Sequence, residues 1–435
     1  MFFGLFSSVE TKMRATAANW LELADKVYNY RRDVLSEAER SALQMASASL
    51  RRQLREKSDA SKLKLGIEAL ENVLRRTGGS HYPRSGWMEN VEFFLVAAIV
   101  ILGVRMYFVQ PFKIPTNSMW PSYNGMTPEV FATQADEPST AGRALRLIAM
   151  GARPRTVDAP VEGEVLVPLV GVGYDRIVIP FQEVKGRDWF ILPSRHKQYT
   201  LLVGQRPVTV TVPLDFDFEW AVRDAFVPQN SDRHDSGSTG IAAHINANPG
   251  QIVKTQDGHQ FWRTGKRVNA GERVLSFDIL TGDQLFVDRM SYHFVKPQVG
   301  DGFVFRTDNI DHPDMRNRAT GRQIEQYYIK RLVGTPGDTL EIRNTTLMRN
   351  GSPIEGAKAF GQNATKEGDY PGYRAVGVLA QGRTYTVPPD SYIALGDNSA
   401  NSQDSRYWGA VPAKDVVGRP LFIYYPFTKR WGPAP

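Results

Sequence analysis

The sequence predicts a mainly β protein that is preceded by an N-terminal helical region and one transmembrane helix. Three observations carry this prediction. Residues 10–76 repeat apolar side chains at helical spacing among many charges. Residues 93–109 are predominantly apolar, and from residue 282 onward short β-type runs alternate with Gly, Pro and Asp. At 435 residues the chain is long enough for two or three domains, so these regions can fold separately.

The N-terminal region, residues 1–87, is predicted to be a cytoplasmic helical hairpin or three-helix unit. Ser36 and Glu39 match a capping box, so a new helix is expected there. Ser58-Asp59 marks a second break, and Thr77-Gly78-Gly79 marks a stop. Two roles stay open, namely a stalk or self-association element and a domain that binds a partner in the envelope or the translocation machinery. Membrane contact by the six apolar first residues is also left open.

Residues 88–109 are predicted to cross the membrane once. A span needs about 20 mostly apolar residues. Trp87 and Tyr107 suit the two interfaces, and Arg105 can extend its charge to water. The alternative is a buried helix of a soluble domain, but the absence of polar residues from the apolar centre favours a span. Lys and Arg are abundant before the segment and sparse just after it, which predicts a cytoplasmic N-terminus and an extracytoplasmic C-terminal part.

A β-rich insert is predicted at about residues 125–280. Residues 163–170, 176–181 and 208–212 read as short strands, and residues 229–240 read as an exposed polar loop. The role and the fold of the insert are left open, including a role in binding an envelope partner.

The composition excludes several classes of site. The net charge of +7 and the pI near 9.3 suit contact with anionic lipid, and the absence of a basic stripe with interleaved aromatic residues argues against a nucleic-acid partner. The chain has no cysteine, which excludes disulfides and thiolate metal sites. The seven histidines show no His-Glu-x-x-His spacing, and His234 and His244 have no convincing partners. No metal and no cofactor are therefore expected.

The segment that follows the apolar stretch contains a candidate nucleophile. Residues 110–123 read Gln-Pro-Phe-Lys-Ile-Pro-Thr-Asn-Ser-Met-Trp-Pro-Ser-Tyr, with Ser118 between two of three prolines. Because proline fixes φ and lacks an N–H, we expect this run to be extended and rigid. A serine that only caps or decorates a loop would not need such a support.

Lys330 is the candidate partner of Ser118. It lies within Tyr-Tyr-Ile-Lys-Arg-Leu-Val, residues 327–333, which read as a strand before the turn at residues 335–338. An edge lysine that extends to water is one interpretation. The other is a buried lysine whose charged form is disfavoured by desolvation, so that the neutral amine can take a proton from a serine hydroxyl.

A third segment, residues 395–409, reads Leu-Gly-Asp-Asn-Ser-Ala-Asn-Ser-Gln-Asp-Ser-Arg-Tyr-Trp-Gly and is dense in turn formers. In this order and behind a membrane segment, the three motifs resemble those of the bacterial type I signal peptidases, also called leader peptidases. Residues 282–289 and 299–305 resemble a further segment of that family. The resemblance implies an antiparallel β catalytic domain over residues 110–435, interrupted by the insert that it does not cover.

The resemblance also implies an activity and a place. The activity is that of a membrane-bound serine endopeptidase, which removes signal peptides from exported preproteins after Ala-x-Ala by a Ser–Lys mechanism. The place is the bacterial inner (plasma) membrane, with the catalytic domain on the periplasmic side. Two alternatives stay open. One is a LexA-like self-cleaving protease, against which the third motif argues. The other is an inactive membrane-anchored scaffold.

Residue roles follow from the matched motifs. Ser118 is the expected nucleophile and Lys330 the general base, while the Ser118 N–H and the Thr116 hydroxyl are the expected oxyanion donors. Ser402 is expected to orient the lysine amine, Asp404 and Arg406 to brace their loop, and Asp397 and Asn398 to hold its turn. The resemblance places these residues in shallow substrate pockets: Phe112, Ile114, Pro115, Met119, Tyr123, Tyr328 and Ile329.

Overall fold

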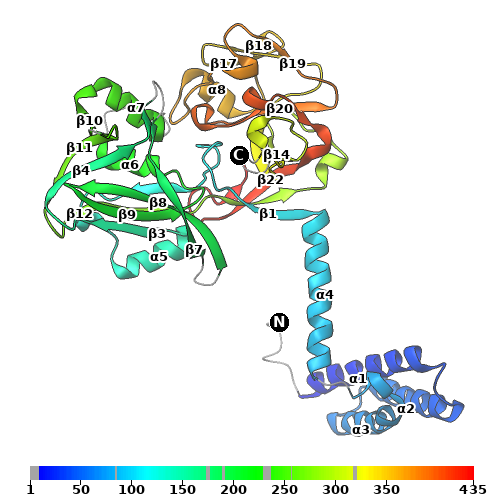
Figure 1. Cartoon of the computed structure of the whole chain (residues 1–435). Coiled ribbons are helices and arrows are strands. Elements are labelled where there is room, and N and C mark those ends of the chain that lie inside the picture. Colours follow the sequence, from blue (N-terminus) through cyan, green and yellow to red (C-terminus); the bar gives the residue numbers. More distant parts are fainter. Residues whose placement is uncertain are drawn as a thin grey trace. The chain divides into compact units, whose positions relative to one another are not determined.

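The structure is a computed structural model, which describes residues 9–83, 86–172, 177–188, 192–228, 237–255, 257–316 and 321–435. The chain divides into two compact units, Met1–Leu102 and Gly103–Pro435. Figure 1 shows helices in the first unit and mostly strands in the second. The predicted mainly β fold with an N-terminal helical region is therefore confirmed.

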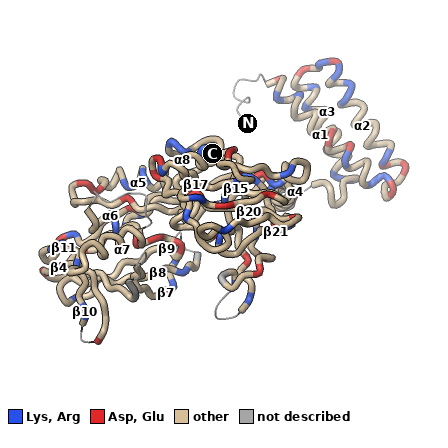
Figure 2. The backbone as a smooth tube through the Cα atoms, turned by 90° about the horizontal axis from the view of Figure 1, so that it is seen from above, with Lys and Arg blue, Asp and Glu red and all other residues tan. Residues whose placement is uncertain are grey.

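The first unit contains three packed helices, α1 (Val9–Arg31), α2 (Glu37–Arg55) and α3 (Ala60–Thr77). Ser36 caps α2 and forms the predicted capping box with Glu39, while the Asp59 side chain accepts from the Lys62 N–H at the start of α3. Apolar faces of the three helices form one core, which includes Leu21, Leu43, Leu50, Leu70 and Leu74. Positions of Lys, Arg, Asp and Glu are spread along all three helices (Figure 2).

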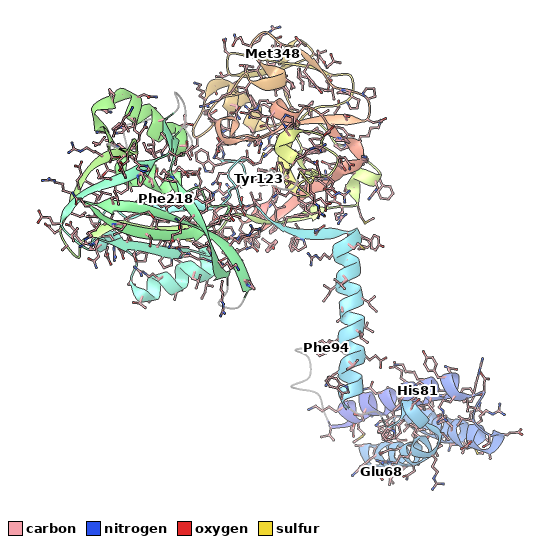
Figure 3. All side chains as sticks on the ribbon, in the orientation of Figure 1. Glu68, His81, Phe94, Tyr123, Phe218 and Met348 are labelled. Atoms are coloured by element: carbon pink, nitrogen blue, oxygen red, sulfur yellow. The ribbon has the colours of Figure 1, made fainter. Side chains whose placement is uncertain are left out.

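One further helix of this region, α4 (Gly86–Tyr107), is long and apolar enough to cross a membrane. Its segment Asn90–Tyr107 has a mean hydropathy of 1.7, and none of that segment is buried against the protein. Phe94 projects outward from it (Figure 3). Among the described residues this is the one helix with that length and composition.

The second unit is built on an antiparallel sheet that we call the main sheet. Its order is β1 (Val109–Lys113), β13 (Gln284–Asp288), β22 (Val416–Tyr425), β14 (Gly302–Arg306), β15 (Tyr327–Gly334), β20 (Ser391–Leu395) and β21 (Val411–Pro412), with β23 (Gly432–Pro433) on β22. The predicted strands at residues 327–333 and 421–426 correspond to β15 and to the end of β22.

A small sheet packs beside the main sheet. Its order is β18 (Ser352–Pro353), β17 (Thr346–Arg349), β16 (Thr339–Arg343) and β19 (Tyr385–Thr386), and α8 (Lys358–Thr365) lies against β17. Asn350 and Gly351 join β17 to β18 with φ values of 53° and 85°. This tight turn needs positive φ at both positions, which Asn and Gly tolerate at the lowest cost.

The described part of the inserted segment forms three further sheets with a shared core that includes Phe218, Trp262 and Phe277 (Phe218 is labelled in Figure 3). One sheet has the order β10 (Ile252–Lys254), β11 (Gln260–Val268), β4 (Gly163–Leu169), β8 (Leu192–Val203) and β7 (Phe181–Asp188), with β9 (Arg206–Pro213) on β8. The second has the order β2 (Thr127–Val130), β12 (Arg273–Leu280) and β3 (Arg153–Asp158), and the third pairs β5 (Gly171–Val172) with β6 (Ile177–Val178).

Three helices of the insert were not predicted: α5 (Thr140–Met150), α6 (Phe218–Phe226) and α7 (Gly237–Ala247). The prediction of an exposed loop was wrong for residues 237–240, which begin α7, while residues 229–236 lie outside the described residues. A Cβ at Gly237 would stand 2.1 Å from the Trp220 backbone nitrogen. The small residues that indicated a loop therefore permit close packing of α7 on α6.

Candidate functional site

Ser118 lies in a compact turn that follows β1. The prediction of an extended run was wrong beyond Pro115, because residues 116–123 bend and turn. The Asn117 side chain organises this turn. Its Nδ2 donates to the Met126 carbonyl at 2.7 Å, and its Oδ1 accepts from the Gly125 N–H at 2.9 Å. Asn117 is buried, so the position of Ser118 is set by these bonds as well as by the neighbouring prolines.

Lys330 reaches Ser118 from the middle of the main sheet. It lies on β15 opposite Phe303 of β14, and only 3% of its surface is exposed. Its Nζ donates a hydrogen bond to the Ser118 Oγ. The structure thus excludes the interpretation of Lys330 as an edge lysine that extends to water. It brings together two side chains that are 212 positions apart in the sequence.

The environment of Lys330 favours the neutral amine. Burial lowers the pKa of Lys330 from the ordinary lysine value to about 8, with Arg406 acting in the same direction. Asp404 and Asp397 act in the opposite direction but do not cancel the effect of burial. A substantial fraction of neutral lysine is therefore present near pH 8, whereas an exposed lysine is almost fully charged there.

Asp404 and Arg406 brace the loop beside this pair. Their side chains are fully buried and form an ion pair at 2.8 Å. The Asp404 carboxylate also accepts from the Gly396 N–H at 2.9 Å, and the Arg406 guanidinium donates to the Ser399 and Ser402 carbonyls at 3.0 and 3.3 Å. These bonds join the two ends of the loop.

The Ser402 side chain lies next to the Ser118–Lys330 pair but forms no hydrogen bond with either of these two residues. Its Oγ is buried and has no hydrogen-bond partner in the part of the chain that the structure describes. A Cβ at Gly396 would stand 2.1 Å from this Oγ and 2.4 Å from the Ser118 carbonyl oxygen, so only glycine lets the two segments approach this closely. The expected orientation of the lysine amine by Ser402 stays a prediction.

The turn of the third motif holds the Ser118 segment directly. The Asn398 N–H donates to the Ser118 carbonyl at 3.1 Å, and its Nδ2 donates to the Asn117 carbonyl at 3.0 Å. Asp397 pairs with Arg331 at 2.6 Å, and both side chains are buried. Sequence reasoning assigned no role to Asn117 or Arg331. Their position inside motifs, directly beside Ser118 and Lys330, was the available signal.

The two expected oxyanion donors differ in their surroundings. Within the described residues, the Ser118 N–H donates no hydrogen bond, so it is available to an incoming oxygen atom. The Thr116 side chain is exposed, two positions before Ser118. A Cβ at Gly125 would stand 2.3 Å from the Thr116 carbonyl carbon. Because glycine has no side chain, the backbone at residue 125 can pass this close to the backbone of Thr116 and support it there.

The residues expected to contact substrate fall into two groups. Phe112, Pro115, Tyr328 and Ile329 are partly exposed beside the pair. Ile114, Met119 and Tyr123 belong instead to a buried core cluster, where Tyr123 is 1% exposed and donates through its hydroxyl to the Pro435 carbonyl at 2.9 Å (Figure 3). The fold thus directs the side chains of all three residues into the core.

No group of three or more His, Asp and Glu side chains that could hold a metal occurs among the described residues.

Comparison with known proteins shows what the chain resembles. Residues 274–425 match the family model described as signal peptidase, peptidase S26. This range includes Lys330 and the third motif but not Ser118.

Individual relatives agree with the family match. The chain is 34% identical over 151 residues to the probable signal peptidase I-1 of Synechocystis sp. and 33% identical over 155 residues to the signal peptidase I of Leptolyngbya laminosa. Each alignment covers 35% of this chain and 66% of the relative, slightly less than two thirds of its length. A solved signal peptidase I from Enterococcus faecalis is 28% identical, with 29% of this chain and 97% of that chain covered at a TM-score of 0.21. Over residues 274–425 the chain is therefore similar to the family described as signal peptidase, peptidase S26.

Proposed function

We propose that the protein is a membrane-anchored serine endopeptidase that removes signal peptides from exported preproteins, with Ser118 as nucleophile and Lys330 as general base. The observation that carries the proposal is the hydrogen bond between the buried Lys330 amine and the Ser118 hydroxyl. A serine beside a lysine of lowered pKa is the Ser–Lys arrangement of nucleophilic catalysis.

The chemistry follows from these two groups. The neutral Lys330 amine takes the Ser118 proton as Oγ attacks the scissile carbonyl carbon, and a C–O bond forms. The Ser118 N–H and the Thr116 hydroxyl stabilise the negative oxygen, a contribution of about 3–4 kcal/mol for each donor of this kind. The protonated Lys330 then gives its proton to the leaving nitrogen, and the C–N bond breaks. A water molecule that loses its proton to Lys330 hydrolyses the acyl-enzyme and restores Ser118.

The substrate is an extended peptide that adds as a strand to the main sheet. Among the described residues, β1 is the terminal strand of that sheet, and β20 pairs with β15 only from Arg331 onward, so residues 327–330 have one edge without a strand partner. The rings of Phe112 on β1 and Tyr327 on β15 pack against each other with their centroids 5.1 Å apart, and this contact connects β1 to β15. Free strand edges accept peptides through backbone hydrogen bonds. The resemblance places Phe112, Tyr328 and Ile329 in shallow pockets that accept small residues, and we expect cleavage after Ala-x-Ala.

Membrane anchoring by α4 completes the proposal. The segment Asn90–Tyr107 supplies the anchor, and β1 begins at Val109, so Ser118 lies a few residues beyond the membrane exit. The excess of Lys and Arg before α4 favours a cytoplasmic N-terminus and an extracytoplasmic site, in a single-pass arrangement at the bacterial plasma membrane.

Cleavage of a preprotein with an Ala-x-Ala signal by the detergent-purified full chain tests this function. We expect the unaltered chain to cut after the second Ala, and Ser118→Ala and Lys330→Met to lose nearly all activity, because such groups act as a unit. Ser352→Ala and Lys358→Met change exposed residues of the same types and serve as matched controls. Equal cleavage by Ser118→Ala and by its control would refute the proposal.

A further inference from the structure

α5 is an amphipathic helix that turns its polar side inward. Arg143 pairs with Glu137 at 2.6 Å, and Arg146 pairs with Glu129 at 2.6 Å and with Asp278 at 2.8 Å. Glu129 lies on β2 and Asp278 on β12, so the helix is attached to the three-stranded sheet of the insert through charges.

The opposite side of α5 is apolar and faces solvent. Leu145 and Ile148 are 69% and 68% exposed, and Ala141 and Ala144 are also exposed. These four positions recur at the spacing of one helix face, which in a globular protein normally packs on the core. An apolar face that the fold leaves uncovered marks an interaction surface.

The apolar face continues onto the main sheet. The Phe427 N–H donates to the Ala149 carbonyl at 2.8 Å, and the Tyr425 hydroxyl donates to the Leu147 carbonyl at 3.2 Å. Phe427 is 62% exposed, and Lys429 is exposed two positions later. We call Leu145, Leu147, Ile148 and Phe427 the α5 patch. It combines an aliphatic stripe, an aromatic ring and a nearby cation.

We infer that the α5 patch lies in the headgroup region of the bilayer to which α4 anchors the chain. This inference rests on the proposed anchoring by α4. The continuity of the fold supports it, because Phe427 follows β22 by two residues, β22 pairs with β13, and β13 pairs with β1, the strand that follows α4. Amphipathic helices bury their apolar faces about 5–10 Å into this region.

The chemistry of the patch suits lipid. Acyl carbons match the aliphatic side chains, and lipid phosphates match Lys429. The anchor also makes this contact intramolecular, so a patch of modest size suffices to hold the insert against the membrane. The insert then limits the orientations of the unit that contains Ser118.

Depth measurements on single-cysteine variants test the inference, since the natural chain has no cysteine. Leu145→Cys and Ile148→Cys report on the patch, Val100→Cys reports on α4, and Gln205→Cys reports on an exposed turn between β8 and β9. Each variant of the full chain is labelled with the fluorophore NBD. It is placed, one chain per disc, in nanodiscs of phosphatidylethanolamine and phosphatidylglycerol.

We expect the labels at 145, 148 and 100 to emit at shorter wavelength and to be quenched several-fold more by doxyl lipid than by aqueous iodide. The label at 205 should show the reverse. If the label at 100 is quenched by lipid while those at 145 and 148 are quenched by iodide, the inference is refuted and the anchoring stands. Shielding of 145 and 148 from both quenchers would also refute it, because protein would then cover the patch. Iodide quenching at 100 would refute the anchoring and the inference together.

Discussion

Trp120 and Trp220 pack edge to face, with ring centroids 5.3 Å apart and an interplanar angle of 86°. Trp120 follows Ser118 by two positions, and Trp220 lies in the first turn of α6 in the insert. A second contact nearby joins Asn401 Nδ2 to Asp217 Oδ2 at 3.5 Å. The start of α6 therefore touches both loops that flank the Ser118–Lys330 pair.

Trp220→Ala should lower kcat by about two- to tenfold, because edge-to-face aromatic pairs contribute about 0.5–1.5 kcal/mol and this pair supports the Ser118 turn. Because Trp220 does not contact Ser118, KM should change less than kcat, and Trp220→Phe should restore most of the rate. Steady-state kinetics on a soluble Ala-x-Ala peptide measure both constants. Unchanged kcat in Trp220→Ala would show that the insert does not position the turn.

The rate of cleavage should rise with pH up to about pH 8. Lys330 must be neutral to accept the Ser118 proton, and burial lowers its pKa to about 8. Below that pH the neutral fraction, and with it kcat, should fall about tenfold for each pH unit. A kcat profile between pH 6 and pH 10 checks this expectation. A profile that is flat through pH 8 would contradict the role of Lys330 as base.

Lys330→Met should be inactive but more stable than the natural chain near neutral pH. In the folded protein the pKa of Lys330 lies near 8, below its unfolded value, so folding disfavours the charged form. This cost is fully present below pH 8 and disappears as the pH rises toward the unfolded pKa. Its upper limit is about 3 kcal/mol at neutral pH. Thermal unfolding at pH 7 and at pH 10 should show a larger gain at pH 7, and equal gains would contradict the explanation.

Asp404→Ala should destabilise the second unit by about 3–5 kcal/mol, because it leaves the buried Arg406 charge without its partner. Glu341→Ala removes one member of a surface pair with Arg343 and should destabilise the chain much less than Asp404→Ala does. Urea unfolding followed by tryptophan fluorescence compares the two variants. Similar losses of stability in both would show that the Asp404–Arg406 pair does not hold the loop.

Local features were predictable from the sequence because they depend on residues a few positions apart. The helix caps at Ser36 and Asp59 depend on a hydrogen bond to a backbone N–H three positions later. The turn at Asn350-Gly351 depends on the positive φ that these two residue types tolerate. Lys330 inside an apolar strand allowed two interpretations, an edge lysine that extends to water and a buried amine, and the structure shows the buried amine. The three motifs indicated the family in the same way, because each is continuous in the chain.

The tertiary structure decided what depends on contacts between distant segments. Three features require the third motif to lie against the first. They are the turn at Ser118, the direction of Met119 and Tyr123 into the core, and the contact of Asn398 with the Ser118 segment. α7 begins with residues typical of loops because only small residues fit against α6. α5 turns its apolar face outward because charges on β2 and β12 hold its polar face. Periodicity reveals that a helix has two faces, but the neighbouring surfaces determine which face is buried.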